Sequence, residues 1–191
     1  MTDTAPTALL VIDVQQGLDD PKYGARNNPD AERNMASLLA AWRKARWPVI
    51  HVQHMSVHPD SPLRPELPGN ALKPEVTPLP GEPLIRKSVN SAFIGTDLEA
   101  RLRGAGIRSV VIVGLTTDHC ISATARTASD VGFDVVVVDD ATATHERLGP
   151  DGVRYTAEQM HGAALASLHG EFARVLSTGD VLVRLAAGES A

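Results

Sequence analysis

Short apolar runs recur along the chain, separated by longer segments in which apolar positions follow a helical spacing. The runs are rich in branched side chains and lack polar alternation, which is typical of strands covered on both faces of a sheet. They lie at residues 8–12, 49–53, 84–86, 110–113, 133–138 and 174–176. We therefore expect a six-stranded sheet buried between other elements.

The segments between these runs carry helix signals. Asn28 is a candidate N-cap with Pro29 in the first turn, and apolar side chains follow at helical spacing as far as Trp42. Two capping pairs open further predicted helices: Thr96 with Glu99, and Thr156 with Gln159. The last of these helices carries an apolar stripe at Ala157, Met160, Ala164, Leu168 and Phe172. Strands that alternate with helices predict a three-layer α/β fold, with a doubly wound, mostly parallel sheet and helices on both faces.

Size and composition favour one small-molecule-binding domain. The chain has 191 residues, of which 43% are hydrophobic, and this suits a single domain over residues 1–191. Its net charge of −5 has no basic cluster set against it, so we expect neither nucleic acid nor a membrane surface as a partner. One cysteine and a start without signal-peptide features predict a cytoplasmic protein.

A segment at about 55–83 holds most of the prolines and no sustained period. Proline fixes the backbone dihedral φ and reduces the entropy lost on ordering, which favours a shaped surface loop. We expect it to form a wall or lid of a pocket, or part of a subunit interface. Arg64 in this loop is a candidate ligand for a substrate carboxylate, although the pattern favours an exposed surface arginine.

Candidate catalytic residues lie where predicted strands end. Residues 114–120 follow a buried strand and lead into a helix whose first turn carries Cys120. A thiol there meets the positive end of a helix dipole, which favours the thiolate. Asp13 and Lys87 follow two other predicted strands, and the carboxyl ends of parallel strands share one edge of a sheet. The alternatives are a buried apolar cysteine, a turn aspartate and a solvated lysine, but their shared edge favours a catalytic trio.

These residues stand in motifs that resemble those of the isochorismatase-like cysteine hydrolases. The matching segments are residues 11–15, Lys87 with 91–93 just after it, and residues 114–120. The resemblance extends from Leu9 to about Leu182. It implies a six-stranded parallel sheet and apolar pocket walls at Leu18 and Phe93.

The same resemblance implies a catalytic triad of Asp13, Lys87 and Cys120, and a thioester intermediate that water hydrolyses. It also implies a cis peptide bond before Thr116. The backbone N–H groups of Thr116 and Cys120 would then form the oxyanion hole. Relatives form dimers and larger assemblies, so we expect a homo-oligomer.

The chain departs from the pattern of the nicotinamidases in this superfamily. They carry an Asp-x-His metal motif after the second strand, where this chain has residues 51–58 without that motif. His54 and His58 have a spacing compatible with metal binding. We nevertheless expect no metal and no cofactor, and assign these histidines to a pocket wall or to solvent. His119 precedes the cysteine and either tunes the thiolate or points outward.

The sequence thus predicts hydrolysis of a C–N bond in a small amide, lactam or carbamoyl substrate through Cys120. An alternative within the family is hydrolysis of a vinyl ether, which does not need the cysteine. A thiol-based redox protein is a second alternative, although without another cysteine it requires an external thiol. A ligand-binding scaffold without activity is a third.

Overall fold

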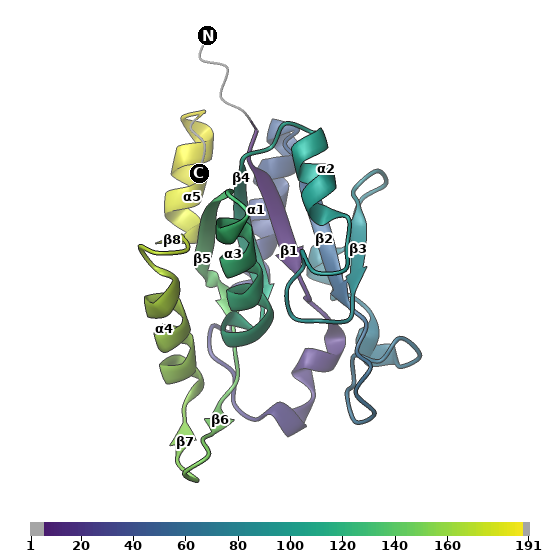
Figure 1. The fold of residues 1–191 in the computed structure, drawn as a ribbon, viewed down its shortest axis with the longest axis vertical. Coiled ribbons are helices and arrows are strands. Elements are labelled where there is room, and N and C mark those ends of the chain that lie inside the picture. Colours follow the sequence, from purple (N-terminus) through teal and green to yellow (C-terminus); the bar gives the residue numbers. More distant parts are fainter. Residues whose placement is uncertain (1–5, 189–191) are drawn as a thin grey trace.

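A six-stranded parallel sheet with strand order β3-β2-β1-β4-β5-β8 forms the centre of the molecule (Figure 1). The computed structural model describes residues 6–188. The sheet strands are β1 (Ala8–Ile12), β2 (Val49–His54), β3 (Leu84–Lys87), β4 (Ser109–Leu115), β5 (Asp134–Ala143) and β8 (Arg174–Leu176). All five residues of β1 are buried, as its unbroken apolar run predicts.

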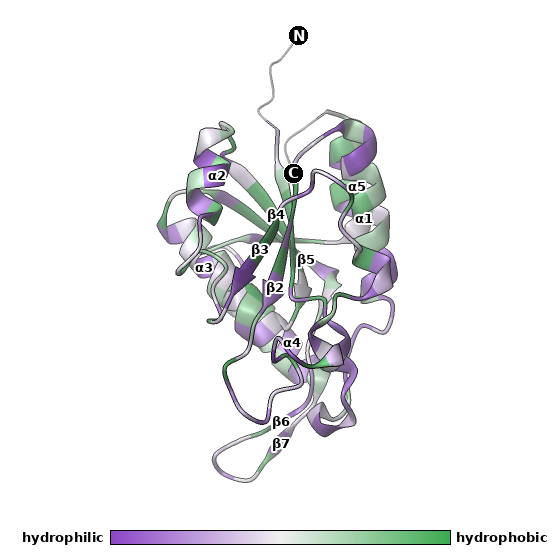
Figure 2. Ribbon diagram, turned by 90° about the vertical axis from the view of Figure 1, so that its right-hand side faces the viewer, coloured by the Kyte–Doolittle hydropathy of each residue, from purple (hydrophilic) through white to green (hydrophobic). Residues whose placement is uncertain are grey.

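Helices cover both faces of this sheet. The helices are α1 (Ala31–Ala45), α2 (Leu98–Gly104), α3 (Ser122–Asp130), α4 (Ala157–Leu168) and α5 (Thr178–Ala186). One core layer joins alternate strand residues to α1 and α5, and the other joins the remaining strand residues to α2, α3 and α4. Figure 2 shows the apolar strands between these helices. The predicted three-layer, doubly wound fold is confirmed.

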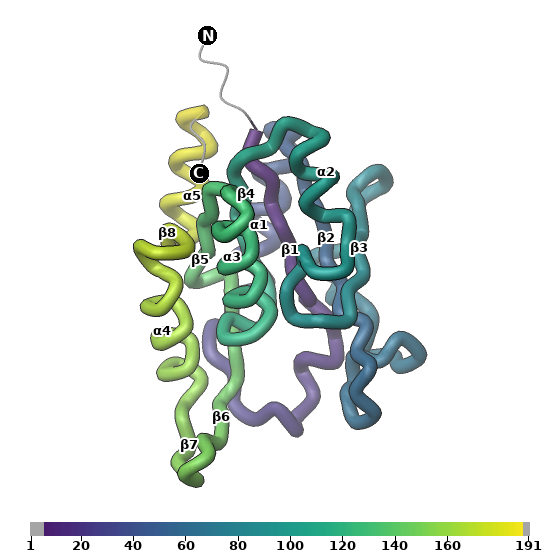
Figure 3. Tube along the Cα trace, viewed as in Figure 1, coloured from purple at the N-terminus to yellow at the C-terminus, as the bar shows by residue number. Residues whose placement is uncertain are grey.

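The strand order reverses between β1 and β4. The chain runs from β1 outward through β2 to β3, then returns to place β4 on the other side of β1. The connections after these two strands therefore leave in opposite directions, which opens a crevice at their carboxyl ends. The segments that follow β1, β2 and β5 gather at this end of the molecule (Figure 3).

Two predicted helix caps are wrong. The N-cap of α1 is Asp30, and Asn28 instead donates hydrogen bonds to the carbonyls of Asp139 and Thr142. The N-cap of α2 is Asp97, and the Thr96 hydroxyl donates to the Ala92 carbonyl while it accepts a hydrogen bond from the Leu98 backbone N–H. At α1, carbonyl acceptors in β5 hold the Asn28 side chain away from the helix start.

The capping box of Thr156 with Gln159 is confirmed at the start of α4. Phe172, however, lies beyond the end of this helix at Leu168, where its ring stacks under the Arg126 guanidinium.

The fifth strand is longer than its apolar run. β5 continues past Val138 through Asp139 and Asp140, after an irregularity in its pairing with β4. Asp140 accepts hydrogen bonds from the backbone and hydroxyl of Thr178 at the start of α5. The two aspartates therefore stand within β5.

The proline-rich segment is a shaped wall. It contains the short 3₁₀ turns η3 (Pro68–Asn70) and η4 (Pro74–Val76). The buried Gln15 side chain, just past β1, donates to the carbonyls of His54 and Asn70. Asn70 in turn donates to the carbonyls of His54 and Leu63. Two amide side chains thus fasten this loop to the ends of β1 and β2.

Several short elements complete the structure: η1 (Gln16–Asp19), η2 (Pro21–Tyr23), the π-helical turn η5 (Thr117–Ile121) and the strands β6 (Arg147–Leu148) and β7 (Arg154–Tyr155) of a small hairpin. Within residues 6–188, no helix has the length and apolar character needed to cross a membrane. The polar start of the chain, residues 1–5, lies outside the described residues.

Candidate active site

Asp13 and Cys120 flank the point where strand order reverses. Asp13 directly follows β1, and Cys120 lies in η5, which begins two residues after β4. Gly114 allows the close approach of the two strands, because a Cβ there would lie 2.0 Å from the Ile12 carbonyl oxygen. Asp13 itself has φ of 52°, a left-handed conformation that costs roughly 1 kcal/mol. Such strain is retained where the surrounding structure needs the side chain in one direction.

Lys87 joins these two residues. It ends β3, and its Nζ lies 2.5 Å from Asp13 Oδ2 and 3.4 Å from Cys120 Sγ. Nζ also lies 3.1 Å from the Val89 carbonyl and 3.2 Å from His54 Nδ1. The structure therefore brings together the three residues that the sequence predicts as a trio, and adds His54 to them.

Electrostatics favour a protonated thiol in the free protein. Burial raises the pKa of the Cys120 thiol, and the Asp13 carboxylate raises it further, against the opposing effect of Lys87. Burial and the neighbouring Asp13 carboxylate thus oppose the effect expected of the helix end, and favour the thiol. Burial also raises the pKa of Asp13, and its Oδ1 has no hydrogen-bond partner among the described residues. That oxygen can accept the thiol proton.

The turn that carries the cysteine is π-helical, and α3 begins only after it, at Ser122. The peptide bond between Leu115 and Thr116 is cis, as the family resemblance implies. Thr116 lies in the wall of the cavity next to Cys120.

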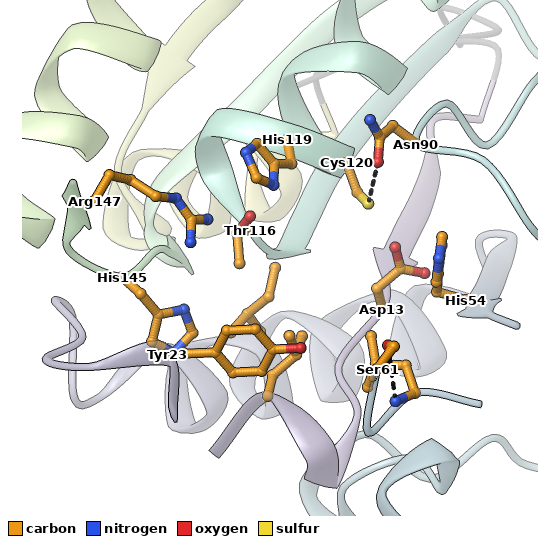
Figure 4. Close-up of a pocket in the computed structure, with 13 residues that line it drawn as sticks. Asp13, Tyr23, His54, Ser61, Asn90, Thr116, His119, Cys120, His145 and Arg147 are labelled. Atoms are coloured by element: carbon orange, nitrogen blue, oxygen red, sulfur yellow. Dashed lines mark hydrogen bonds between the residues drawn. The ribbon is translucent and has the colours of Figure 1, made fainter. Parts of the chain in front are cut away.

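A cavity of about 200 Å³ opens beside the cysteine (Figure 4). Its wall is formed by Asp13, Leu18, Tyr23, His54, Ser61, Leu63, Asn90, Leu115, Thr116, His119, Cys120, His145 and Arg147. Leu18 is an apolar wall residue, as expected. Ser61 and Leu63 come from the proline-rich segment, which supports its assignment as a pocket wall.

Two predicted substrate contacts lie elsewhere. Phe93 is buried in the core against Phe133, with ring centroids 5.8 Å apart. Arg64 pairs with Glu66 across 3.1 Å, and neither Phe93 nor Arg64 belongs to the cavity wall. His119 does reach the wall, with more than half of its side chain exposed and its Nε2 3.6 Å from Asp118.

The histidines after β2 have separate roles. His54 lines the cavity, whereas a ring nitrogen of His58 accepts a hydrogen bond from the Asp60 backbone. The ligating atoms of Asp13, His54 and Cys120 lie within 4.8 Å of one another. The Lys87 ammonium contacts all three, so a metal cation would have to displace a positive charge from this position.

Sequence reasoning missed the side of the cavity that lies across from Cys120. Tyr23, His145 and Arg147 form it (Figure 4). His145 and Arg147 follow the end of β5 at Ala143, but the predicted strand ends at residue 138, so no direct signal for them was present in the sequence. Asp118 fixes Arg147, whose Nε lies 3.0 Å from Oδ2 of that carboxylate.

The family is decided by comparison with known proteins. The family model of the Isochorismatase domain matches residues 7–180. The chain belongs to the isochorismatase family. Within it, the chain is 44% identical over 175 residues to the Bacillus subtilis family protein YrdC, covering 92% of this chain and 94% of that protein.

Other members show the same fold and a named activity. A crystal structure of a family protein from Chromobacterium violaceum superposes with a TM-score of 0.93 at 45% identity, over 97% of this chain and 96% of that one. The ureidoacrylate amidohydrolase RutB of Agrobacterium fabrum is 34% identical over 112 residues, which are 52% of this chain and 48% of that protein. The chain is therefore an isochorismatase-family hydrolase with an amidohydrolase among its relatives.

Proposed function

We propose that this protein is a cysteine hydrolase that cleaves a C–N bond in a small amide, lactam or carbamoyl substrate. The observation that carries the proposal is the contact of Lys87 Nζ with both Asp13 and Cys120 at the wall of a substrate-sized cavity. A relative named as an amidohydrolase supports the bond type. The chain's own groups suffice for this chemistry, so the proposal needs no metal or cofactor.

In the first half-reaction, Cys120 Sγ attacks the scissile carbonyl carbon while its proton passes to Asp13. A general base is needed because burial keeps the thiol protonated. The carbonyl oxygen becomes an oxyanion, which the backbone N–H groups of Thr116 and Cys120 bind. Asp13 then donates the proton to the leaving nitrogen as the C–N bond breaks, and a thioester remains on Cys120.

In the second half-reaction, Asp13 takes a proton from water, and the resulting hydroxide equivalent attacks the thioester carbonyl. The C–S bond breaks, Sγ regains the proton, and the carboxylic or carbamic acid leaves. Lys87 stays hydrogen bonded to Asp13 throughout and keeps one carboxylate oxygen fixed, so that the other serves as the proton acceptor.

Turnover of a panel of small amides, ureas and lactams by the wild type and by Cys120→Ala tests this proposal. We expect turnover of at least one substrate class by the wild type and loss of at least about 10³-fold in the variant. Equal turnover by both would exclude Cys120 as the nucleophile. Turnover of none of these substrates by the wild type would contradict C–N bond hydrolysis and favour the vinyl-ether alternative.

A further inference from the structure

The cavity wall across from Cys120 contains an unpaired polar atom. His145 is 3% exposed, and its Nδ1 has no hydrogen-bond partner among the described residues. A buried polar atom without a partner costs about 1–3 kcal/mol. Its neighbours in the wall are Arg147 and the Tyr23 ring, whose centroid lies 5.4 Å from that of His145. Because His145 lines the cavity, a molecule bound there is a candidate partner for this atom.

Arg147 offers a donor beside it. Asp118 occupies one edge of the guanidinium, with Oδ2 3.0 Å from Nε and Oδ1 3.5 Å from Nη2. Within residues 6–188, no hydrogen bond or ion pair uses Nη1. The guanidinium is thus held in place by one edge and keeps donors on the other.

The charges in this cavity cancel in pairs. Asp118 compensates Arg147, and Asp13 compensates Lys87. Burial and the nearby Arg147 lower the pKa of His145, and burial likewise lowers that of His54, so both rings are neutral at neutral pH. A carboxylate placed here would carry a net negative charge into a neutral, half-enclosed site, which has no spare cation to compensate it.

We propose that Arg147 and His145 form a binding site for an uncharged amide edge at the end of the substrate remote from the scissile bond. The substrate C=O accepts from Arg147, and the adjacent substrate N–H donates to His145 Nδ1. Carboxamides, ureides and lactams present this pair of groups, whereas a carboxylate has no N–H for the imidazole. The inference rests on the proposed hydrolase function and narrows its substrate class to neutral molecules with two amide-type groups.

Succinamide and succinamate are matched probes, because they differ only in one terminal carboxamide or carboxylate. Their binding to Cys120→Ala, measured by NMR titration at neutral pH, requires no turnover. We expect succinamide to bind at least about tenfold more tightly than succinamate, because only succinamide can donate a hydrogen bond to the buried His145 Nδ1. Equal affinity, tighter binding of succinamate, or no saturable binding of either would overturn the proposal.

Two further changes, each in the Cys120→Ala background, assign the effect to the wall residues. His145→Phe keeps a ring against Tyr23 but removes Nδ1, and should weaken succinamide binding by about tenfold. Asp118→Asn leaves Arg147 uncompensated, and should shift the ratio of the two affinities toward succinamate. A ratio of two probes is insensitive to partial loss of folded protein.

Arg154→Gln is the matched control, because Arg154 stands in the same hairpin, pairs with Glu146 and lies outside the cavity wall. It should leave both affinities unchanged. An unchanged ratio in Asp118→Asn, together with unchanged succinamide affinity in His145→Phe, would contradict the proposed site even if the amide hydrolase activity stands. If the wild type hydrolyses no amide, but Cys120→Ala still binds succinamide more tightly than succinamate, the proposed function alone would be contradicted.

Discussion

The Lys87 ammonium donates a 2.5 Å hydrogen bond to the Asp13 carboxylate, and both side chains are almost fully buried. Replacement of one partner in a buried ion pair leaves the other without compensation, which costs about 3 kcal/mol or more. Replacement of both by residues of similar volume avoids that cost. Single and double variants of this pair can therefore distinguish an effect on stability from an effect on catalysis.

We expect Lys87→Met to lower the free energy of unfolding by about 3 kcal/mol, or less if Asp13 becomes protonated. The double variant Asp13→Asn/Lys87→Met should recover most of that stability and none of the activity. Urea unfolding and kcat/KM measure the two quantities. A double variant that regains activity would show that the pair only supports the fold.

The protonated thiol predicts slow alkylation. Because burial and Asp13 raise the pKa of Cys120, we expect iodoacetamide to label the wild type slowly at neutral pH and faster as pH rises. Asp13→Asn removes the neighbouring negative charge and should label faster at neutral pH, although it loses hydrolase activity. The labelling rate is followed by intact mass. Rapid labelling of the wild type at neutral pH would contradict the assigned protonation state.

His54 should set part of the acid limit of activity. An ammonium has three N–H groups, and Lys87 faces four acceptors: Asp13 Oδ2, the Val89 carbonyl, His54 Nδ1 and Cys120 Sγ. Burial, and then Lys87, lower the pKa of His54, so the ring stays neutral until pH falls below its ordinary range. Once protonated, it places a second cation 3.2 Å from Lys87.

We therefore expect kcat/KM of the wild type to fall as pH decreases through the lowered pKa of His54. In His54→Gln, whose amide oxygen accepts the same hydrogen bond without titrating, the fall should move to lower pH. His54→Ala should reduce kcat at every pH by loss of the acceptor. Identical acid limits in the wild type and His54→Gln would show that His54 does not set the acid limit of activity.

A second charged cluster, remote from the cysteine, should govern acid stability. Burial raises the pKa of Glu32, but hydrogen bonds from Arg26 and Lys73 lower it more, from its ordinary 4.5 to about 2. A lowered carboxylate pKa stabilises the folded state above the unfolded value, and that contribution disappears as pH falls from about 4.5 to about 2.

The shift corresponds to about 3 kcal/mol at neutral pH. Urea unfolding from neutral pH down to about pH 3 should therefore show a loss of stability in the wild type that Glu32→Gln lacks over this range. Glu99→Gln, at an exposed i,i+4 pair with Arg103, is the matched control and should follow the wild type. Parallel curves of unfolding free energy against pH for all three proteins would mean that the Glu32 cluster contributes nothing to acid stability.

The sequence was sufficient to predict the sheet and the proximity of Asp13, Lys87 and Cys120 because both follow from simple rules of strand burial and strand direction. An apolar run such as residues 8–12 can only be buried, and the carboxyl ends of parallel strands must share an edge. The cap at Asn28 failed for a non-local reason, since the carbonyls it satisfies belong to β5, more than a hundred residues away. Propensity at one position contains no information on such acceptors.

The effect of burial on the Cys120 thiol and the cavity wall at His145 and Arg147 were also beyond local reasoning. A helix dipole can be inferred from residues 117–121, but the desolvation of Cys120 depends on how tightly the sheet edge is covered. His145 and Arg147 become a wall only because η5 supplies Asp118 to orient the guanidinium. Arg64, which lies in a conspicuous loop, proves to pair with Glu66 instead.

Intact-mass analysis of acid-quenched wild type during turnover of its best amide substrate detects the proposed thioester on Cys120 itself. We expect a mass increase equal to the acyl part of the substrate, located on Cys120 by peptide mapping, reversible on substrate exhaustion and absent in Cys120→Ala. Undiminished amide turnover by Cys120→Ala, or an acyl group on any other residue, would contradict it.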